Sequence, residues 1–130
     1  MTIRFEDLRG TTDAAGDVVV TAPTPHYGRL VGVEWVDGDL ADNNTSVLTC
    51  TGSPSGVVST LNTLAAGEGD DDGWWYPTIA VHDLSAVGRF YNDESDEPVI
   101  GYPLVNGYLK LTIAAGGDTK TGGAIVYVDE

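Results

Sequence analysis

The end of the chain carries the pattern that most constrains its fold. Tyr108–Ala114 alternates apolar residues with other residues, and Ala124–Val128 is an apolar run rich in β-branched side chains. A glycine-rich stretch separates the two. Alternation with a period of two places successive side chains on opposite faces of a strand. The sequence therefore predicts a β-hairpin here, with a loop longer than the two-residue type.

The rest of the chain repeats short strand-like runs between turn signals at intervals of about ten residues. Strands are expected at Thr2–Arg9, Asp17–Ala22, Gly28–Val36, Ser46–Thr51 and Thr78–Leu84. Gly32 marks a β-bulge in the third of these. Val57–Ala66 fits a short helix by its apolar spacing and a strand by its threonines. We expect an all-β fold, one β-sandwich or jelly-roll domain over residues 1–130, with at most one short helix.

Twenty acidic residues face six basic ones, which gives a formal net charge of −14. Self-repulsion at this charge opposes a compact state. Salt screens the repulsion, because the Debye length falls to roughly 3 Å at 1 M salt. With Lys110 and Lys120 as the lysines, the composition indicates adaptation to high salt. A general solubility device, or binding of cations or basic partners, is the alternative interpretation.

Salt should therefore stabilise the folded chain. We expect its melting temperature to be higher in KCl at about 1 M than at about 0.1 M, because screening weakens the repulsion among carboxylates. Thermal melts at the two salt concentrations measure this. A melting temperature that stays flat or falls with added KCl would remove the argument from charge.

Composition also excludes several partners. The basic residues are scattered along the chain, so neither free nucleic acid nor an anionic membrane is an expected partner. No apolar run approaches the ~20 residues that span a bilayer. Residues 1–6 do not read as a signal peptide, and we expect synthesis in a cytoplasm. Cys50 lies in an alternating apolar stretch, which predicts a buried, inert thiol.

Residue patterns typical of enzymes are weak. His26 and His82 are far apart in the sequence and read as unrelated histidines. Gly52–Gly56 is similar in outline to a nucleophile elbow, but Pro54 occupies the position of the nucleophile. No phosphate-binding glycine pattern occurs. We expect no enzymatic activity and no catalytic residue.

One acidic turn is a candidate metal site. Asp37, Asp39 and Asp42 bring three carboxylates close together, and Ca²⁺ prefers such hard oxygen ligands. The spacing does not match an EF-hand. A solvated acidic turn is the competing interpretation here, as it is for Asp70–Asp72 and Asp93–Glu97. Calcium on these three residues is the only cofactor that the sequence suggests.

Aromatic residues indicate an interface. Trp74, Trp75 and Tyr76 follow a stretch of glycine and aspartate, where turn chemistry does not call for large rings. Adjacent residues on an extended chain point opposite ways, so we expect some of these rings in the core and others in a contact with a partner. If the rings do not form the interface, the next candidate is the N-terminal strand Thr2–Arg9 with Ile3 and Phe5, because its exposed edge could pair with a neighbour.

Three blocks, together under half of the chain, resemble a family of small capsid decoration (cement) proteins of tailed phages and tailed viruses of archaea. The blocks are Gly28–Trp35 followed by the Asp39–Asp42 turn, then Tyr102–Leu104, then Gly107–Gly122. The resemblance implies a virion protein that binds the outer surface of the capsid and stabilises it, with the major capsid protein as partner. The acid excess departs from the bacterial-phage pattern and favours a haloarchaeal virus.

The resemblance also implies a homo-oligomer, because decoration proteins bridge neighbouring shell subunits. A trimer over a local threefold axis is expected, with a pentamer over the fivefold axis as the alternative. Two other functions stay open. One is a surface or secreted Ca²⁺-binding or carbohydrate-binding β-sandwich of a halophile, which the lack of a signal peptide disfavours. The other is a tail or head–tail joining protein.

Overall fold

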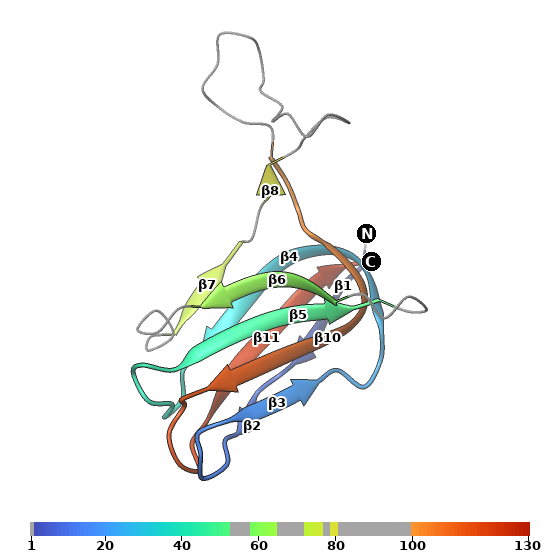
Figure 1. The fold of residues 1–130 in the computed structure, drawn as a ribbon. Coiled ribbons are helices and arrows are strands. Elements are labelled where there is room, and N and C mark those ends of the chain that lie inside the picture. Colours follow the sequence, from blue (N-terminus) through green and yellow to red (C-terminus); the bar gives the residue numbers. More distant parts are fainter. Residues whose placement is uncertain (1, 53–57, 65–71, 77–78, 81–99) are drawn as a thin grey trace, which may run out of the picture.

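A computed structural model describes residues 2–52, 58–64, 72–76, 79–80 and 100–130 of the chain (Figure 1). Its strands are β1 (Ile3–Asp7), β2 (Gly10–Thr11), β3 (Val18–Thr21), β4 (His26–Val36), β5 (Thr45–Thr51), β6 (Val58–Leu64), β7 (Gly73–Trp75), β8 (Ile79–Ala80), β9 (Ile100–Gly101), β10 (Leu104–Ala114) and β11 (Thr121–Asp129). No helix occurs in the described residues. The expectation of an all-β fold is confirmed.

Nine of the described strands form one curled antiparallel sheet, and β8 pairs with β9 separately. The curl gives the fold two layers, as in a sandwich (Figure 1). One layer contains β1, β11, β4 and β7, and the other contains β3, β10, β5 and β6. Strand β4 joins them, because residues 26–29 pair with β10 and residues 29–36 pair with β11.

The core lies between the two layers. Each long strand points alternate residues inward, as its burial pattern shows for β5 and β10. The inward side chains are almost all aliphatic, and those buried to 2% exposure or less include Leu30, Val33, Val105, Leu109, Leu111, Ile113, Val126 and Val128. The residues that alternate between apolar and other types in the sequence thus alternate between inward and outward positions in the structure.

The expected hairpin between Tyr108–Ala114 and Ala124–Val128 is wrong. Both segments are strands and the chain turns between them, but β10 pairs with β3, β4 and β5, whereas β11 pairs with β1, β2 and β4. The turn carries the chain from one layer to the other, so that the apolar faces of β10 and β11 can pack across the core. Alternation identifies the buried face of a strand but not its neighbour.

The expected bulge at Gly32 and the expected burial of Cys50 are confirmed, and the stretch that fitted both helix and strand contains a strand. The ambiguous Val57–Ala66 stretch contains strand β6. The bulge falls beside Gly32, because Tyr127 pairs with Gly32 while the next residue, Val128, pairs with Leu30. Cys50 is buried at 3% exposure, and its Sγ accepts a hydrogen bond from the Asn106 N–H at 3.3 Å. Most of the expected Thr78–Leu84 strand lies outside the described residues.

Candidate interaction surface

The sequence Trp74-Trp75-Tyr76 divides between the core and the surface. Strand β7 pairs with β4, with Trp75 opposite Val33 and Trp74 opposite Glu34. Trp75 packs against the core. Trp74 and Tyr76 point to the other side and are 52% and 69% exposed. This is the division that alternation along an extended chain predicts.

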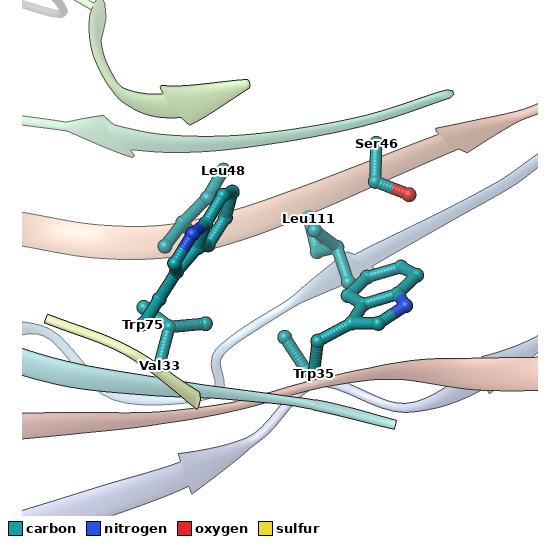
Figure 2. A pocket seen from close by; sticks show the side chains of 7 residues that line it. Val33, Trp35, Ser46, Leu48, Trp75 and Leu111 are labelled. Atoms are coloured by element: carbon teal, nitrogen blue, oxygen red, sulfur yellow. The ribbon is translucent and has the colours of Figure 1, made fainter. Parts of the chain in front are cut away.

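The inward tryptophans close one part of the interior. Trp75 of β7 and Trp35 of β4 reach into the space between the layers, where they meet Val33, Leu48 and Leu111 (Figure 2). The cavity left among these side chains measures about 10 Å³. A space of this size holds about one water molecule at most. Trp35 and Trp75 therefore fill the interior there and leave no room for a ligand.

The outward rings form a continuous surface with two others. Phe5 of β1 lies opposite Tyr127 of β11, and their ring centroids are 6.3 Å apart. The Trp74 ring lies 5.3 Å from the Tyr127 ring and 6.4 Å from the Tyr76 ring. We call Phe5, Tyr127, Trp74 and Tyr76 the aromatic row. It runs across the outer face of the layer that contains β1, β11, β4 and β7.

One residue of β4 near these rings is a glycine and therefore carries no side chain. Gly32 of β4 faces Tyr127 across the β4–β11 ladder. A Cβ atom at Gly32 would lie 4.0 Å from the Tyr76 ring, which is ordinary contact distance. The nearest ring to this position is thus that of Tyr76, and a Cβ atom here would meet no atom of Trp74 or Tyr127 within 4 Å. Ile3, which is also exposed, extends the same face along β1.

Charged groups border the aromatic row. The Tyr127 hydroxyl donates a hydrogen bond to Glu34 Oε2 at 3.3 Å, and burial together with this carboxylate raises the pKa of Tyr127. Arg9 forms two hydrogen bonds to Asp7, at 2.9 and 2.6 Å. Hydrogen bonding to Arg9 lowers the pKa of Asp7, although burial acts against it. A hollow of about 400 Å³ lies beside Trp74, between Arg9, Glu34 and Asp72.

Sequence reasoning found four of these surface residues and missed a fifth. Ile3, Phe5, Trp74 and Tyr76 were expected at an interface and lie on one face, whereas Trp75 lies inward. Tyr127, which touches both Phe5 and Trp74, was not singled out. The sequence did indicate an outward position for Tyr127, because it lies between two apolar residues, Val126 and Val128, that are buried.

The expected calcium ligands serve the fold in this structure. Asp39 Oδ1 accepts a hydrogen bond from the Thr121 N–H at 2.6 Å, and Asp39 N–H donates to the Thr121 carbonyl at 3.1 Å. The Asp37 N–H donates to Asp72 at 2.8 Å. Asp42 is exposed. Within the described ranges, no group of three or more His, Cys, Asp or Glu residues is arranged to hold a metal ion. The calcium site stays a prediction.

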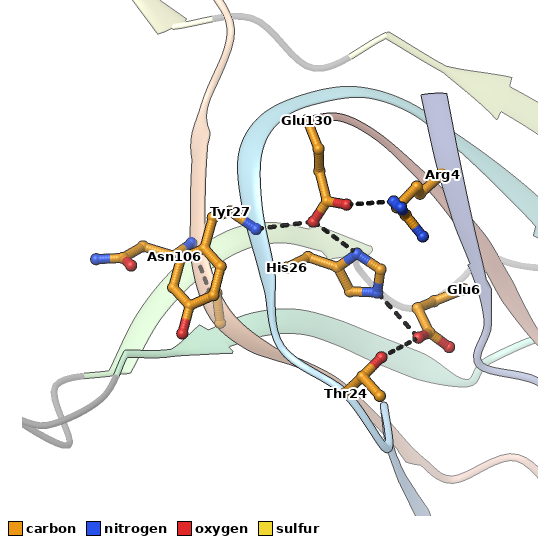
Figure 3. A network of polar contacts seen from close by, with 8 residues as sticks. Arg4, Glu6, Thr24, His26, Tyr27, Asn106 and Glu130 are labelled. Atoms are coloured by element: carbon orange, nitrogen blue, oxygen red, sulfur yellow. Dashed lines mark hydrogen bonds and ion pairs between the residues drawn. The ribbon is translucent and has the colours of Figure 1, made fainter. Parts of the chain in front are cut away.

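His26 lies in a polar cluster with Glu6, Glu130 and Arg4 (Figure 3). It is 5% exposed, and its Nε2 and Nδ1 atoms lie 2.9 Å from Glu6 and 3.1 Å from Glu130. Arg4 Nε lies 2.9 Å from the second oxygen of Glu130. Both ring nitrogens of His26 thus face a carboxylate oxygen. The groups pair with one another and tie the edge strand β1 to the start of β4. His82 lies outside the described residues.

This cluster predicts a dependence of stability on pH. The hydrogen bond from the Tyr27 N–H lowers the pKa of Glu130, and the charge of His26 lowers it further. Burial acts in the opposite direction, but the pKa stays below its ordinary value. A carboxyl with a depressed folded-state pKa stabilises the fold above its unfolded-state pKa, and this contribution is lost as pH falls through the folded-state pKa. We expect wild type to lose stability relative to Glu130→Gln on acidification.

Melting temperatures of both proteins through the carboxyl range measure this difference. Comparison with the variant is needed because protonation of the other carboxylates also relieves self-repulsion. Asp42→Asn is the matched control, since Asp42 is an exposed acid outside the cluster. Parallel pH curves for wild type and Glu130→Gln would contradict the assignment.

Within the described part of the chain, no helix is long and apolar enough to cross a membrane. Comparisons of the chain with protein-family models, with curated proteins and with solved structures found no match in any of the three.

Proposed function

We propose that this chain is a virion structural protein that binds the outer surface of a tailed-virus capsid and stabilises it. Its partner is the major capsid protein, and it is made in the cytoplasm of the host. The observation that carries the proposal is the exposed aromatic row on a protein with a net charge of −14. The resemblance of the three sequence blocks to decoration proteins supports it.

The aromatic row has the composition of a protein-binding surface. Trp and Tyr are the residues that most often carry binding energy at interfaces, and they are usually ringed by polar groups. Here, Phe5, Trp74 and Tyr76 are each more than half exposed, and Glu34 and the Arg9–Asp7 pair border them. The hollow beside Trp74 gives a side chain of the shell a place to enter.

The large negative charge supports the same proposal through its effect on docking. Two acidic surfaces repel each other, and salt screens this repulsion over a few ångströms. Contact energy must then come from apolar groups, which salt does not weaken. An aromatic surface on a highly acidic domain is therefore suited to binding in a high-salt cytoplasm. The homo-oligomer proposed with this function is a trimer, or alternatively a pentamer.

A second candidate function is a carbohydrate-binding domain. One observation favours it: the exposed Trp74 ring lies beside a hollow that also presents Arg9, Glu34 and Asp72. An aromatic face together with a few convergent polar groups is a common arrangement in sites for small ligands. The hollow is within the size range of such sites, roughly 300–1,000 Å³.

Binding to purified particles tests the proposal. Particles of the virus that encodes the chain are purified in high salt, and its copies are counted by quantitative mass spectrometry against the major capsid protein. We expect a copy number that scales with the number of shell subunits. A few copies per particle would place the chain in the tail or the head–tail joint. Absence from particles, with binding to an oligosaccharide panel that is lost in Trp74→Ala, would favour the second candidate.

A further inference from the structure

The hollow beside Trp74 borders the aromatic row and has a partly polar lining. It measures about 400 Å³, which is within the size range of small-ligand sites, roughly 300–1,000 Å³. Glu34 of β4 stands opposite Trp74 of β7 in the sheet, and Asp72 directly precedes β7. Arg9 completes the polar lining, and the other lining residues are apolar or glycine. One long side chain of a partner can therefore enter here beside an exposed tryptophan.

The carboxylates of the hollow outnumber its available cations. The Arg9 guanidinium donates two hydrogen bonds to Asp7, from Nε at 2.9 Å and from Nη2 at 2.6 Å, so its charge is already compensated. Glu34 accepts a hydrogen bond from the Tyr127 hydroxyl at 3.3 Å, and Asp72 accepts one from a backbone N–H at 2.8 Å. Among the residues that the structure describes, none forms an ion pair with Glu34 or Asp72. The hollow therefore presents uncompensated negative charge.

Docking of the aromatic row on a partner covers this charge. Trp74 lines the hollow together with Glu34 and Asp72, so a surface that contacts Trp74 also displaces water from the two carboxylates. A carboxylate that loses its water and gains no partner is costly. The same charge becomes favourable when the partner places a cation against it. A surface that fits the aromatic row must therefore carry a positive group at this position.

We propose that the hollow receives an arginine side chain of the docking partner. The inference rests on the proposed function in one respect, which is that the partner is the major capsid protein. A guanidinium group is planar and always charged, stacks on aromatic faces and donates several hydrogen bonds to carboxylates. Tryptophan is the best aromatic ring for such a cation. Trp74, Glu34 and Asp72 together provide both kinds of contact.

Other occupants fit this lining less well. A phosphate or carboxylate group is repelled by Glu34 and Asp72. A sugar hydroxyl bonds to a carboxylate but leaves its charge uncompensated. A lysine ammonium is a compact, strongly hydrated charge that does not combine stacking with bidentate hydrogen bonds. High salt does not remove the preference for arginine, because partly buried ion pairs are screened much less than exposed ones.

Particle binding by a double variant, Glu34→Gln with Asp72→Asn, tests the inference. Both changes remove charge and keep an amide oxygen that accepts the present hydrogen bonds. Titration of particles stripped of the chain, in high salt, should show an affinity at least about tenfold weaker than that of wild type. Thermal melts establish that the variant is folded.

The control is a second double variant, Asp17→Asn with Asp42→Asn. It removes the same charge at exposed positions outside the hollow. Because two acidic surfaces repel each other, the loss of carboxylates does not by itself weaken docking. The affinity of the control for particles should therefore equal or exceed that of wild type.

A second measurement uses the free chain and a defined probe. N-acetylarginine methylamide is titrated into the isotope-labelled chain, and the indole N–H signal of Trp74, assigned by its absence in Trp74→Ala, is followed by NMR. We expect a saturable shift, with a dissociation constant at least about tenfold higher in the variant that carries Glu34→Gln and Asp72→Asn. The citrulline counterpart has nearly the same shape but no charge, and it should produce no saturable shift.

The outcomes separate this inference from the proposed function. The inference is overturned, and the proposed function stands, if the hollow variant binds particles as tightly as wild type or if the citrulline probe binds as tightly as the arginine probe. Absence of a saturable shift with the arginine probe overturns it too. A chain that binds the arginine probe in the hollow but does not bind particles supports the arginine site and overturns the proposed function. Weaker binding of the hollow variant to both particles and probe, with the control unchanged, supports both.

Discussion

Replacing Trp74 and Tyr76 together with alanine should leave the domain folded and weaken its binding to particles by at least about 30-fold. A buried interface ring is commonly worth about 2 kcal/mol, and each 1.4 kcal/mol is a factor of ten in affinity. Both side chains are more than half exposed in the free chain, so little folding energy depends on them. Titration of particles stripped of the chain measures the affinity.

Tyr27→Ala is the control for this experiment. Tyr27 is exposed to a similar extent as Trp74 but lies outside the aromatic row, and its hydrogen bond to Glu130 comes from the backbone. We expect its affinity for particles to match that of wild type. A folded double variant that still decorates particles fully would exclude the aromatic row as the docking surface.

Replacing Trp75 with alanine should lower the free energy of unfolding by about 3 kcal/mol. Large-to-small changes of a buried tryptophan cost about 3–5 kcal/mol, and the partial exposure of Trp75 places it at the low end. Trp75 packs on Val33 and Leu48 at the edge of the core, so its removal leaves a cavity between the layers. Because domains are stable by only about 5–15 kcal/mol, the loss should be plain in denaturant unfolding.

Trp74→Ala provides the comparison, since the two residues are adjacent and chemically identical. Its free energy of unfolding should change by less than about 1 kcal/mol, in the range of surface substitutions. Both proteins are measured in the same high salt. Equal losses for the two variants would contradict the inward and outward division of β7.

The strands were predictable from the sequence because burial of one face of a strand places an apolar residue at every second position. Ser46–Thr51 and Gly28–Val36 were found for that reason, and the glycine of the latter marked the bulge. The pairing of strands was not predictable in the same way. The hairpin between β10 and β11 failed because alternation describes each strand alone, and the turn after Ala114 crosses between layers.

The candidate surface was predictable in its parts but not as a whole. An exposed tryptophan in Trp74-Trp75 follows from alternation along β7. Its contact with Phe5 through Tyr127 does not, since the three residues lie in β7, β1 and β11 and meet only through the order of strands in the sheet.

The most direct test of the central claim is a density map of the virus particle at a resolution that traces side chains. The proposed function predicts this domain on the outside of the capsid, in many copies, with Phe5, Trp74 and Tyr76 against the major capsid protein. A map in which the shell carries no such domain would contradict the proposed function. So would a map in which the chain appears only in the tail or at the head–tail joint.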